Sequence, residues 1–125
     1  MRPELKFFHS PDVDDVGAWT PDVVDCPVSY WLELDIGPPG DEAADIFGVY
    51  VTTDKDVRRK LNADGKAVRF IASPYEWSKV VAVIDGDLDA CSASSWHAAV
   101  ALLRRRFDWE YEGMIPFAGQ GDDLR

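Results

Sequence analysis

The side chains best suited to chemistry are a run of carboxylates in the second half of the chain. Asp85, Asp87 and Asp89 have the spacing of the first three ligands in a helix-loop-helix calcium site. The sixth and twelfth positions of such a loop need glycine and glutamate, and this chain has Ala90 and Trp96 there. We therefore expect no calcium site, and we interpret the segment as a solvated acidic face or the end of a helix.

Three other patterns contain catalytic or metal-binding residue types. His9, Ser10 and Asp12 are the residue types of a hydrolase triad, but no nucleophile-elbow sequence surrounds the serine. Neither His9 nor His97 has a histidine or cysteine at zinc spacing. The carboxylates of residues 12–15 are typical of a solvated loop, and the sequence has no phosphate loop or dinucleotide fingerprint. We predict a protein that is not an enzyme and has no metal or cofactor.

Two acidic pairs keep a hydrolase open as an alternative. Glu33 pairs with Asp35 and Glu110 with Glu112, each pair alternating with apolar residues along an expected strand. A glycosidase-like pair would need one carboxyl group in an apolar cleft. The alternation instead directs both members of each pair outward, where exposed charges belong.

A predicted hairpin positions most of these carboxylates. Residues 28–36 alternate between apolar and polar, which indicates a strand with one buried face. Gly-Pro-Pro-Gly at 37–40 ends this strand, and a second strand is expected over residues 46–52. We expect the two strands to be antiparallel, because they are close neighbours in sequence.

The wet face of the first hairpin strand carries Trp31 beside Glu33 and Asp35. Tryptophan is common among the anchor residues of protein interfaces, so Trp31 is one candidate for an anchor. The alternative is that Trp31 packs beneath the long polar connection of residues 12–25. That connection is expected to be ordered and held by Val16 and Trp19.

The remaining elements follow from local periodicity. Strands are expected over residues 4–9, 66–72 and 107–112, and helices over about 54–61, after Ser73 and after Ser95. A capping box is predicted from Ser73, Pro74 and Glu76, and Gly86 weakens the helix that follows. The side chains expected to point inward are Leu5, Phe7, Val68, Phe70, Ala72, Trp77, Val80, Val81, Ile84 and Leu88.

This order of elements predicts an α+β fold, with a mostly antiparallel sheet of about five strands and two or three helices packed on one face. A chain of 125 residues can bury a core as one domain. We expect that domain over residues 1–113, followed by a loosely ordered tail over 114–125.

Charge restricts the classes of partner. The net charge is −10, and no lysine or arginine occurs between Phe7 and Asp54. Nucleic acid and anionic membranes are therefore disfavoured as partners, whereas a basic protein would be attracted. The alternative is an acidic surface that serves solubility. With no secretory signal and no apolar run long enough to span a membrane, we expect a cytoplasmic protein in which Cys26 and Cys91 are thiols, a disulfide being the less favoured alternative.

An ordered set of short motifs resembles a known family. These are Glu4-Leu5-Lys6, His9-Ser10-Pro11-Asp12, Ile36-Gly37-Pro38 with the acidic loop after it, the Trp96 helix and Trp109-Glu110-Tyr111-Glu112. Together they resemble immunity protein family 8 of bacterial polymorphic toxin systems, from about residue 3 to 113. The segment 53–57 departs from the family pattern because it has no tryptophan, and the tail after Gly113 matches nothing in it.

The resemblance implies a small cytoplasmic protein that binds and neutralises a cognate toxin domain without catalysis or a cofactor. Many such toxins are nucleases with basic grooves, so the hypothesis is that an acidic surface covers a groove of this kind. The alternative is a regulatory module that binds a small molecule in a deep apolar cleft. The candidate toxin-binding residues are Asp12, Asp14, Asp15, Trp31, Glu33, Asp35, Asp41 and Glu42.

Overall fold

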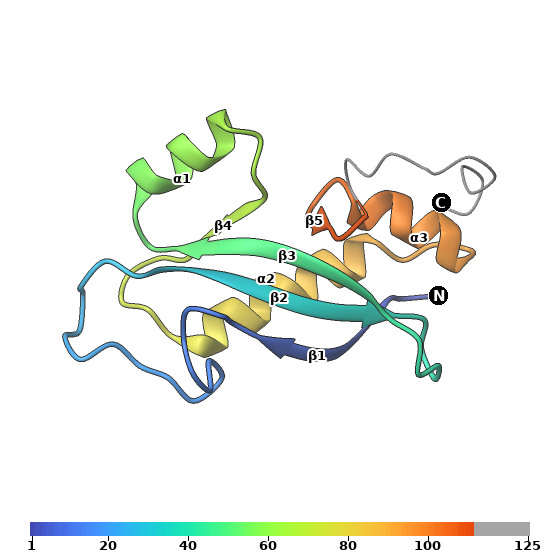
Figure 1. Ribbon diagram of the computed structural model, residues 1–125, viewed down its shortest axis with the longest axis horizontal. Coiled ribbons are helices and arrows are strands. Elements are labelled where there is room, and N and C mark those ends of the chain that lie inside the picture. Colours follow the sequence, from blue (N-terminus) through green and yellow to red (C-terminus); the bar gives the residue numbers. More distant parts are fainter. Residues whose placement is uncertain (112–125) are drawn as a thin grey trace.

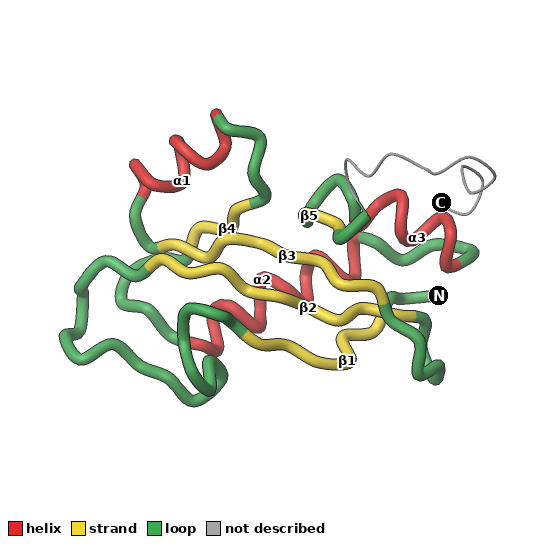
Figure 2. Tube along the Cα trace, viewed as in Figure 1, coloured by secondary structure: helices red, strands yellow, loops and turns green. Residues whose placement is uncertain are grey.

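The computed structural model describes residues 1–111 of the chain, and these form a mixed sheet with helices (Figure 1). The elements are β1 (Glu4–His9), β2 (Ser29–Gly37), β3 (Asp45–Thr52), α1 (Lys55–Ala63), β4 (Val68–Phe70), α2 (Trp77–Ala90), α3 (Trp96–Leu103) and β5 (Asp108–Trp109). The strand order is β1-β2-β3-β4, with β5 also beside β3. Among the described residues, β3 and β4 pair in parallel and the other strand pairs are antiparallel. Figure 2 distinguishes these strands from the helices by colour. The predicted α+β class with a mostly antiparallel sheet is confirmed.

The β2–β3 hairpin is the centre of the fold. Its register pairs Ser29 with Thr52 at one end and Ile36 with Asp45 at the other. The apolar side chains of both strands alternate onto one face, as the period of two requires, and are almost fully buried there. These side chains are Tyr30, Leu32, Leu34, Ile36, Phe47, Val49 and Val51.

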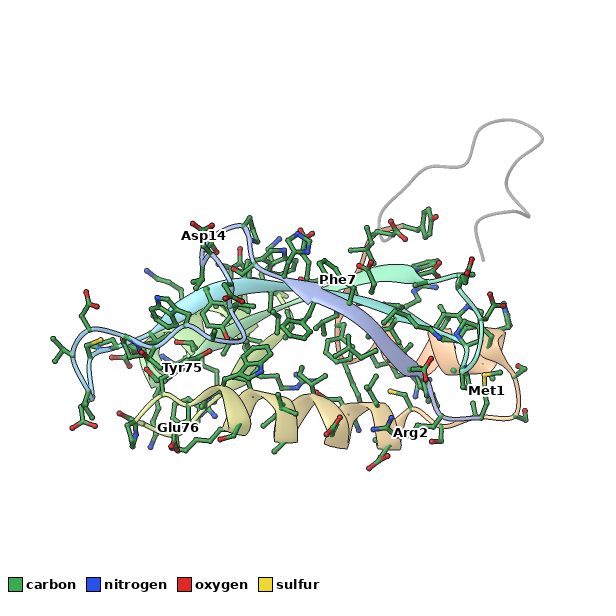
Figure 3. The ribbon with its side chains drawn as sticks, turned by 90° about the horizontal axis from the view of Figure 1, so that it is seen from below. Met1, Arg2, Phe7, Asp14, Tyr75 and Glu76 are labelled. Atoms are coloured by element: carbon green, nitrogen blue, oxygen red, sulfur yellow. The ribbon has the colours of Figure 1, made fainter. Side chains whose placement is uncertain are left out.

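The helices α2 and α3 cover that buried face (Figure 3). Val80, Ile84 and Leu88 are buried one helical turn apart along α2, which continues past Gly86 to its end. The Ser95 side chain accepts a hydrogen bond from the main-chain N–H of Ala98, which confirms the predicted cap of α3. By contrast, α1 has no buried residue and lies beyond the β4 end of the sheet.

The side-chain directions predicted for β1 are wrong at Phe7 and Phe8, whereas Leu5 points inward as predicted. A bulge between Leu5 and Phe7 shifts the register of β1 against β2. Because the bulge adds a residue to β1, Leu5 and Phe8 both pack against the core, and Phe7 is 57% exposed. The period of two therefore holds only on each side of the bulge.

Two further groups of inward side chains also need correction. After β4 it is Ile71 that is buried, whereas Ala72 is exposed. Phe70 is half-buried, because its ring lies beneath the Arg58 guanidinium of α1, 5.0 Å from the ring centroid. On α2, Val81 is 39% exposed.

The predicted capping box does not form. Residues 73 and 74 are joined by a cis peptide bond, and α2 starts at Trp77 with Glu76 as its N-cap, without a side-chain cap. Tyr75 is buried in the core, and its hydroxyl shares a hydrogen bond with that of Tyr30. This segment therefore packs into the core and does not begin a helix. The last strand, β5, is also shorter than predicted, and the expected tail from residue 114 lies outside the described residues.

Candidate functional site: the open face of the sheet

The face of the sheet turned away from α2 and α3 carries the candidate residues of β2, which are Trp31, Glu33 and Asp35. We call this surface the open face, and it consists of Phe7, His9, Trp31, Glu33, Asp35, Ile46, Gly48 and Tyr50. The strand register arranges these residues in rows that run across β1, β2 and β3. In two rows a β2 carboxylate, Asp35 or Glu33, lies between a residue of β1 and a residue of β3, and the third row pairs Trp31 of β2 with Tyr50 of β3.

The first row is a carboxylate between two exposed apolar side chains. Asp35 pairs with Phe7 of β1 on one side and with Ile46 of β3 on the other. Phe7 is 57% exposed and Ile46 is 40% exposed. A contiguous exposed apolar patch with a polar rim is a mark of protein-binding surfaces, and this row places two such apolar side chains on the same face.

The second row is His9, Glu33 and Gly48, and Glu33 connects it to the third row, which is Trp31 and Tyr50. His9 Nε2 lies 3.2 Å from Glu33 Oε1, and the indole Nε1 of Trp31 donates a hydrogen bond of 3.2 Å to Glu33 Oε2. Both carboxylate oxygens of Glu33 therefore orient neighbouring rings. Because this carboxylate lies on an open sheet face and has two partners, it is not arranged as one half of a glycosidase-like pair in an apolar cleft.

The Trp31 indole lies against the sheet. It packs edge-on to Tyr50 with 4.7 Å between ring centroids, and it covers Gly48 so closely that a Cβ atom there would be 1.9 Å from Trp31 Cζ2. A side chain at position 48 would therefore displace the Trp31 indole from the sheet. Trp31 also contacts the loop that precedes β2: the main-chain N–H of Trp31 donates a 2.8 Å hydrogen bond to Asp12 Oδ2. The anchor role of Trp31 stays a prediction.

The acidic loop of residues 10–28 is held by aromatic packing. Val16 is buried, and Trp19 packs edge-on to Tyr75 and Tyr30, as the sequence predicted for the loop anchors. The two tyrosine hydroxyls share a 2.7 Å hydrogen bond. Burial is the main cause that raises the pKa of both tyrosines above the ordinary value. Asp14 is therefore held on the side of the sheet away from α2 by an ordered loop (Figure 3).

The structure separates the candidate acids into two groups. Asp12, Asp14 and Asp15 lie in the loop that precedes β2, next to the open face, whereas Asp41 and Glu42 lie in the loop that follows β2. These loops are at opposite ends of the hairpin (Figure 1). Asp41 also accepts a 2.9 Å hydrogen bond from the main-chain N–H of Ala43 and so stabilises its own turn.

Sequence reasoning missed the exposed apolar residues around this face. The alternation of β3, with Phe47 inward, already implied that Ile46 points outward. Phe7 carried no such signal, because the β1 bulge depends on pairing with β2. Val23 and Val24 in the acidic loop are exposed by 66% and 68%, and no periodicity marked them.

The calcium-like segment is part of a salt-bridge network inside and beside α2. Asp87 is 5% exposed and accepts hydrogen bonds of 2.8 and 3.1 Å from Arg69 and of 2.8 Å from Arg106. Asp85 and Asp89 face Arg2. The interpretation as a solvated acidic face is therefore wrong for Asp87, whose carboxylate joins α2 to β4 and to the chain after α3.

The cavities bear on the small-molecule alternative. A nearly apolar cavity between β1 and α2 has a volume of about 140 Å³, well below the several hundred Å³ of typical ligand sites. A larger space of about 580 Å³ is an open groove beside β1. Residues 1–111 contain no cluster of three or more His, Cys, Asp or Glu side chains that could hold a metal ion. In the same part of the chain, no helix is long and apolar enough to cross a membrane.

The fold and the open face define a class: a small α+β domain with its core on one side of a sheet and an acidic, aromatic face on the other. Comparison with protein families then assigns the chain. Residues 3–114 match the family model Immunity protein 8, so the chain belongs to the immunity protein 8 family, as the sequence motifs indicated. As a member it is an immunity protein, a class that neutralises toxins. Neither the curated proteins nor the solved structures gave a match.

Proposed function

We propose that this protein neutralises one cognate toxin domain by binding it through the open face and the acidic loop, without catalysis. The observation that carries this proposal is the row of Phe7, Asp35 and Ile46, in which a carboxylate is flanked by exposed apolar side chains. Such a surface offers apolar area for affinity and negative charge for orientation.

The expected partner is basic, and a nuclease is the leading candidate. The net charge of −10 and the absence of Lys and Arg from the segment between Phe7 and Asp54 create a negative field around this surface. A nuclease groove that binds phosphates is positively charged, so an acidic protein could occupy the groove and associate quickly. Trp31 would be the aromatic anchor at the centre of such an interface.

The first test is co-expression of the chain with the toxin domain encoded beside it, followed by pull-down and a growth assay. We expect a stable complex and rescued growth. With the purified pair, Asp35→Lys should reduce affinity by about tenfold or more, and raising the salt concentration should slow association. Failure to bind and to rescue growth would contradict the proposal for that toxin.

A matched charge reversal separates this surface from general electrostatics. Asp64 is exposed at the C-cap of α1, away from the rows of the open face. Asp64→Lys changes the net charge by the same amount as Asp35→Lys and should alter affinity less than about threefold. Equal losses from the two variants would show that the open face is not the contact surface.

A further inference from the structure

A groove runs along the free edge of β1, next to the open face. Within residues 1–111, β1 pairs with β2 alone, and it forms the outer strand of the sheet. The groove has a volume of about 580 Å³, and its walls are residues 5–10 of β1 and its end together with residues 13–17 of the acidic loop. A free strand edge therefore lies inside a concave space, in contrast to a flat surface.

The chemistry of the groove is mixed along its length. Leu5 and Phe8 turn toward the core, and the Phe8 ring packs against Trp77 with 4.9 Å between centroids. Val13 and the buried Val16 add apolar surface from the loop. Asp14 and Asp15 are exposed where the loop lines the groove. An occupant would meet main-chain groups and Lys6 along β1, apolar surface from both walls, and carboxylates on the loop side.

An extended peptide fits these features. Peptides that add a strand to a sheet edge gain affinity from main-chain hydrogen bonds, while alternate side chains enter pockets and give specificity. The β1 bulge limits regular pairing to the part after Lys6, because a bulge disrupts the ladder where it occurs. The paired stretch of an added strand would therefore be short and would lie beside Phe7, Phe8 and His9.

We propose that β1 receives an extended segment of the cognate toxin, which pairs with β1 as an additional strand and directs a lysine or arginine toward Asp14 and Asp15. This inference rests on the proposed toxin-binding function and assigns a mode of recognition to it. The charge argument selects the occupant: Asp14 and Asp15 line the loop side of the groove, and the one lysine in its lining, Lys6, is ion-paired with Glu4, so a basic side chain is favoured on the loop side. A second copy of the chain is disfavoured, because each copy has a net charge of −10.

Amide hydrogen exchange of the purified complex tests the strand pairing. In the free protein, we expect the N–H groups on the open side of β1 to exchange quickly, because within residues 1–111 no strand pairs with that side. In the complex with the toxin domain, we expect peptides that cover residues 5–10 to exchange at least about tenfold more slowly, together with one segment of the toxin. If a tight complex forms and the β1 amides exchange as in the free chain, strand pairing is refuted and the proposed function stands. If no complex forms, the proposed function itself fails.

A pair of loop variants tests the carboxylate contact. Asp14 lines the groove, whereas Asp22 is an exposed carboxylate of the same loop that does not line it. Asp14→Lys should weaken binding by about tenfold or more, and Asp22→Lys, with the same change in net charge, by less than about threefold. Equal effects of the two variants would overturn the assignment of a basic side chain to this groove. Slow β1 exchange already present in the free chain, with a dimer in sedimentation, would assign the groove to a second copy.

Discussion

Gly48→Ala should destabilise the protein through a single contact, that with Trp31. A Cβ atom at position 48 would lie 1.9, 2.4 and 2.8 Å from its three nearest neighbours, and all three belong to the Trp31 indole. Ordinary contact begins at 3.4 Å, so the ring must retreat by about 1.5 Å. The indole would then lose its place on the sheet, although no charge has been changed.

The cost can be worked out from the contacts that hold the ring. Displacing Trp31 removes its hydrogen bond to Glu33, worth about 1 kcal/mol when partly solvated. It also removes the edge-to-face packing on Tyr50, worth about 0.5–1.5 kcal/mol. Replacing a strand glycine with alanine returns about 0.5–1 kcal/mol. We therefore expect the free energy of unfolding to fall by about 0.5–2 kcal/mol.

The sign of the effect should reverse when Trp31 is absent. In a Trp31→Ala background the added methyl group meets no indole, so Gly48→Ala should be neutral or should stabilise the protein by up to about 1 kcal/mol. Urea denaturation followed by far-ultraviolet circular dichroism measures all four proteins of this cycle. An equal loss of stability in both backgrounds would refute the close contact of Trp31 with Gly48.

Two further predictions concern the core. Asp87→Ala leaves two arginines without their buried partner, so it should lower the free energy of unfolding by about 3–5 kcal/mol in urea denaturation; Asp85→Ala, an exposed carboxylate of the same helix, should cost less than about 1 kcal/mol. A similar small cost for both would contradict a buried network. Burial raises the pKa of Tyr30 and Tyr75, so the folded state holds these phenolic protons more tightly than the unfolded state does. The stability from this source is full below about pH 10 and is lost as the pH rises above it. The slope of stability against pH between about 10 and 11 should be shallower in the Tyr30→Phe, Tyr75→Phe double variant, and an unchanged slope would contradict the assignment.

The hairpin could be predicted from the sequence because its information is local. Alternation over residues 28–36 and 46–52 fixes which side chains are buried, and a slip of one residue would expose the whole set. The same alternation placed Trp31, Glu33 and Asp35 on the outward face. The outward direction of these three side chains can be predicted from the sequence because strand geometry alone determines it.

The features that could not be predicted depend on contacts distant in sequence. The bulge that turns Phe7 outward exists only in pairing with β2. Asp87 resembled a solvated carboxylate, because its partners Arg69 and Arg106 are 18 and 19 residues away. The capping signal at Ser73 failed because burial of Tyr75 outweighs a local cap. The separation of Asp41 from Asp14 likewise follows from the length of the hairpin and not from their shared charge.

An exposed strand edge can pair with an identical chain as well as with a binding partner. In this chain the same charged residues affect both kinds of pairing. Edge strands invite pairing with identical chains unless bulges or charges oppose it. Here β1 carries both a bulge and Lys6, whose ammonium group forms an ion pair with Glu4. The adjacent carboxylates disfavour pairing with a second acidic copy, because like charges repel, and they favour pairing with a basic segment. Negative charge beside the edge can therefore select for a basic partner and against self-association through one mechanism, and within residues 1–111 no other strand pairs with the outer side of β1.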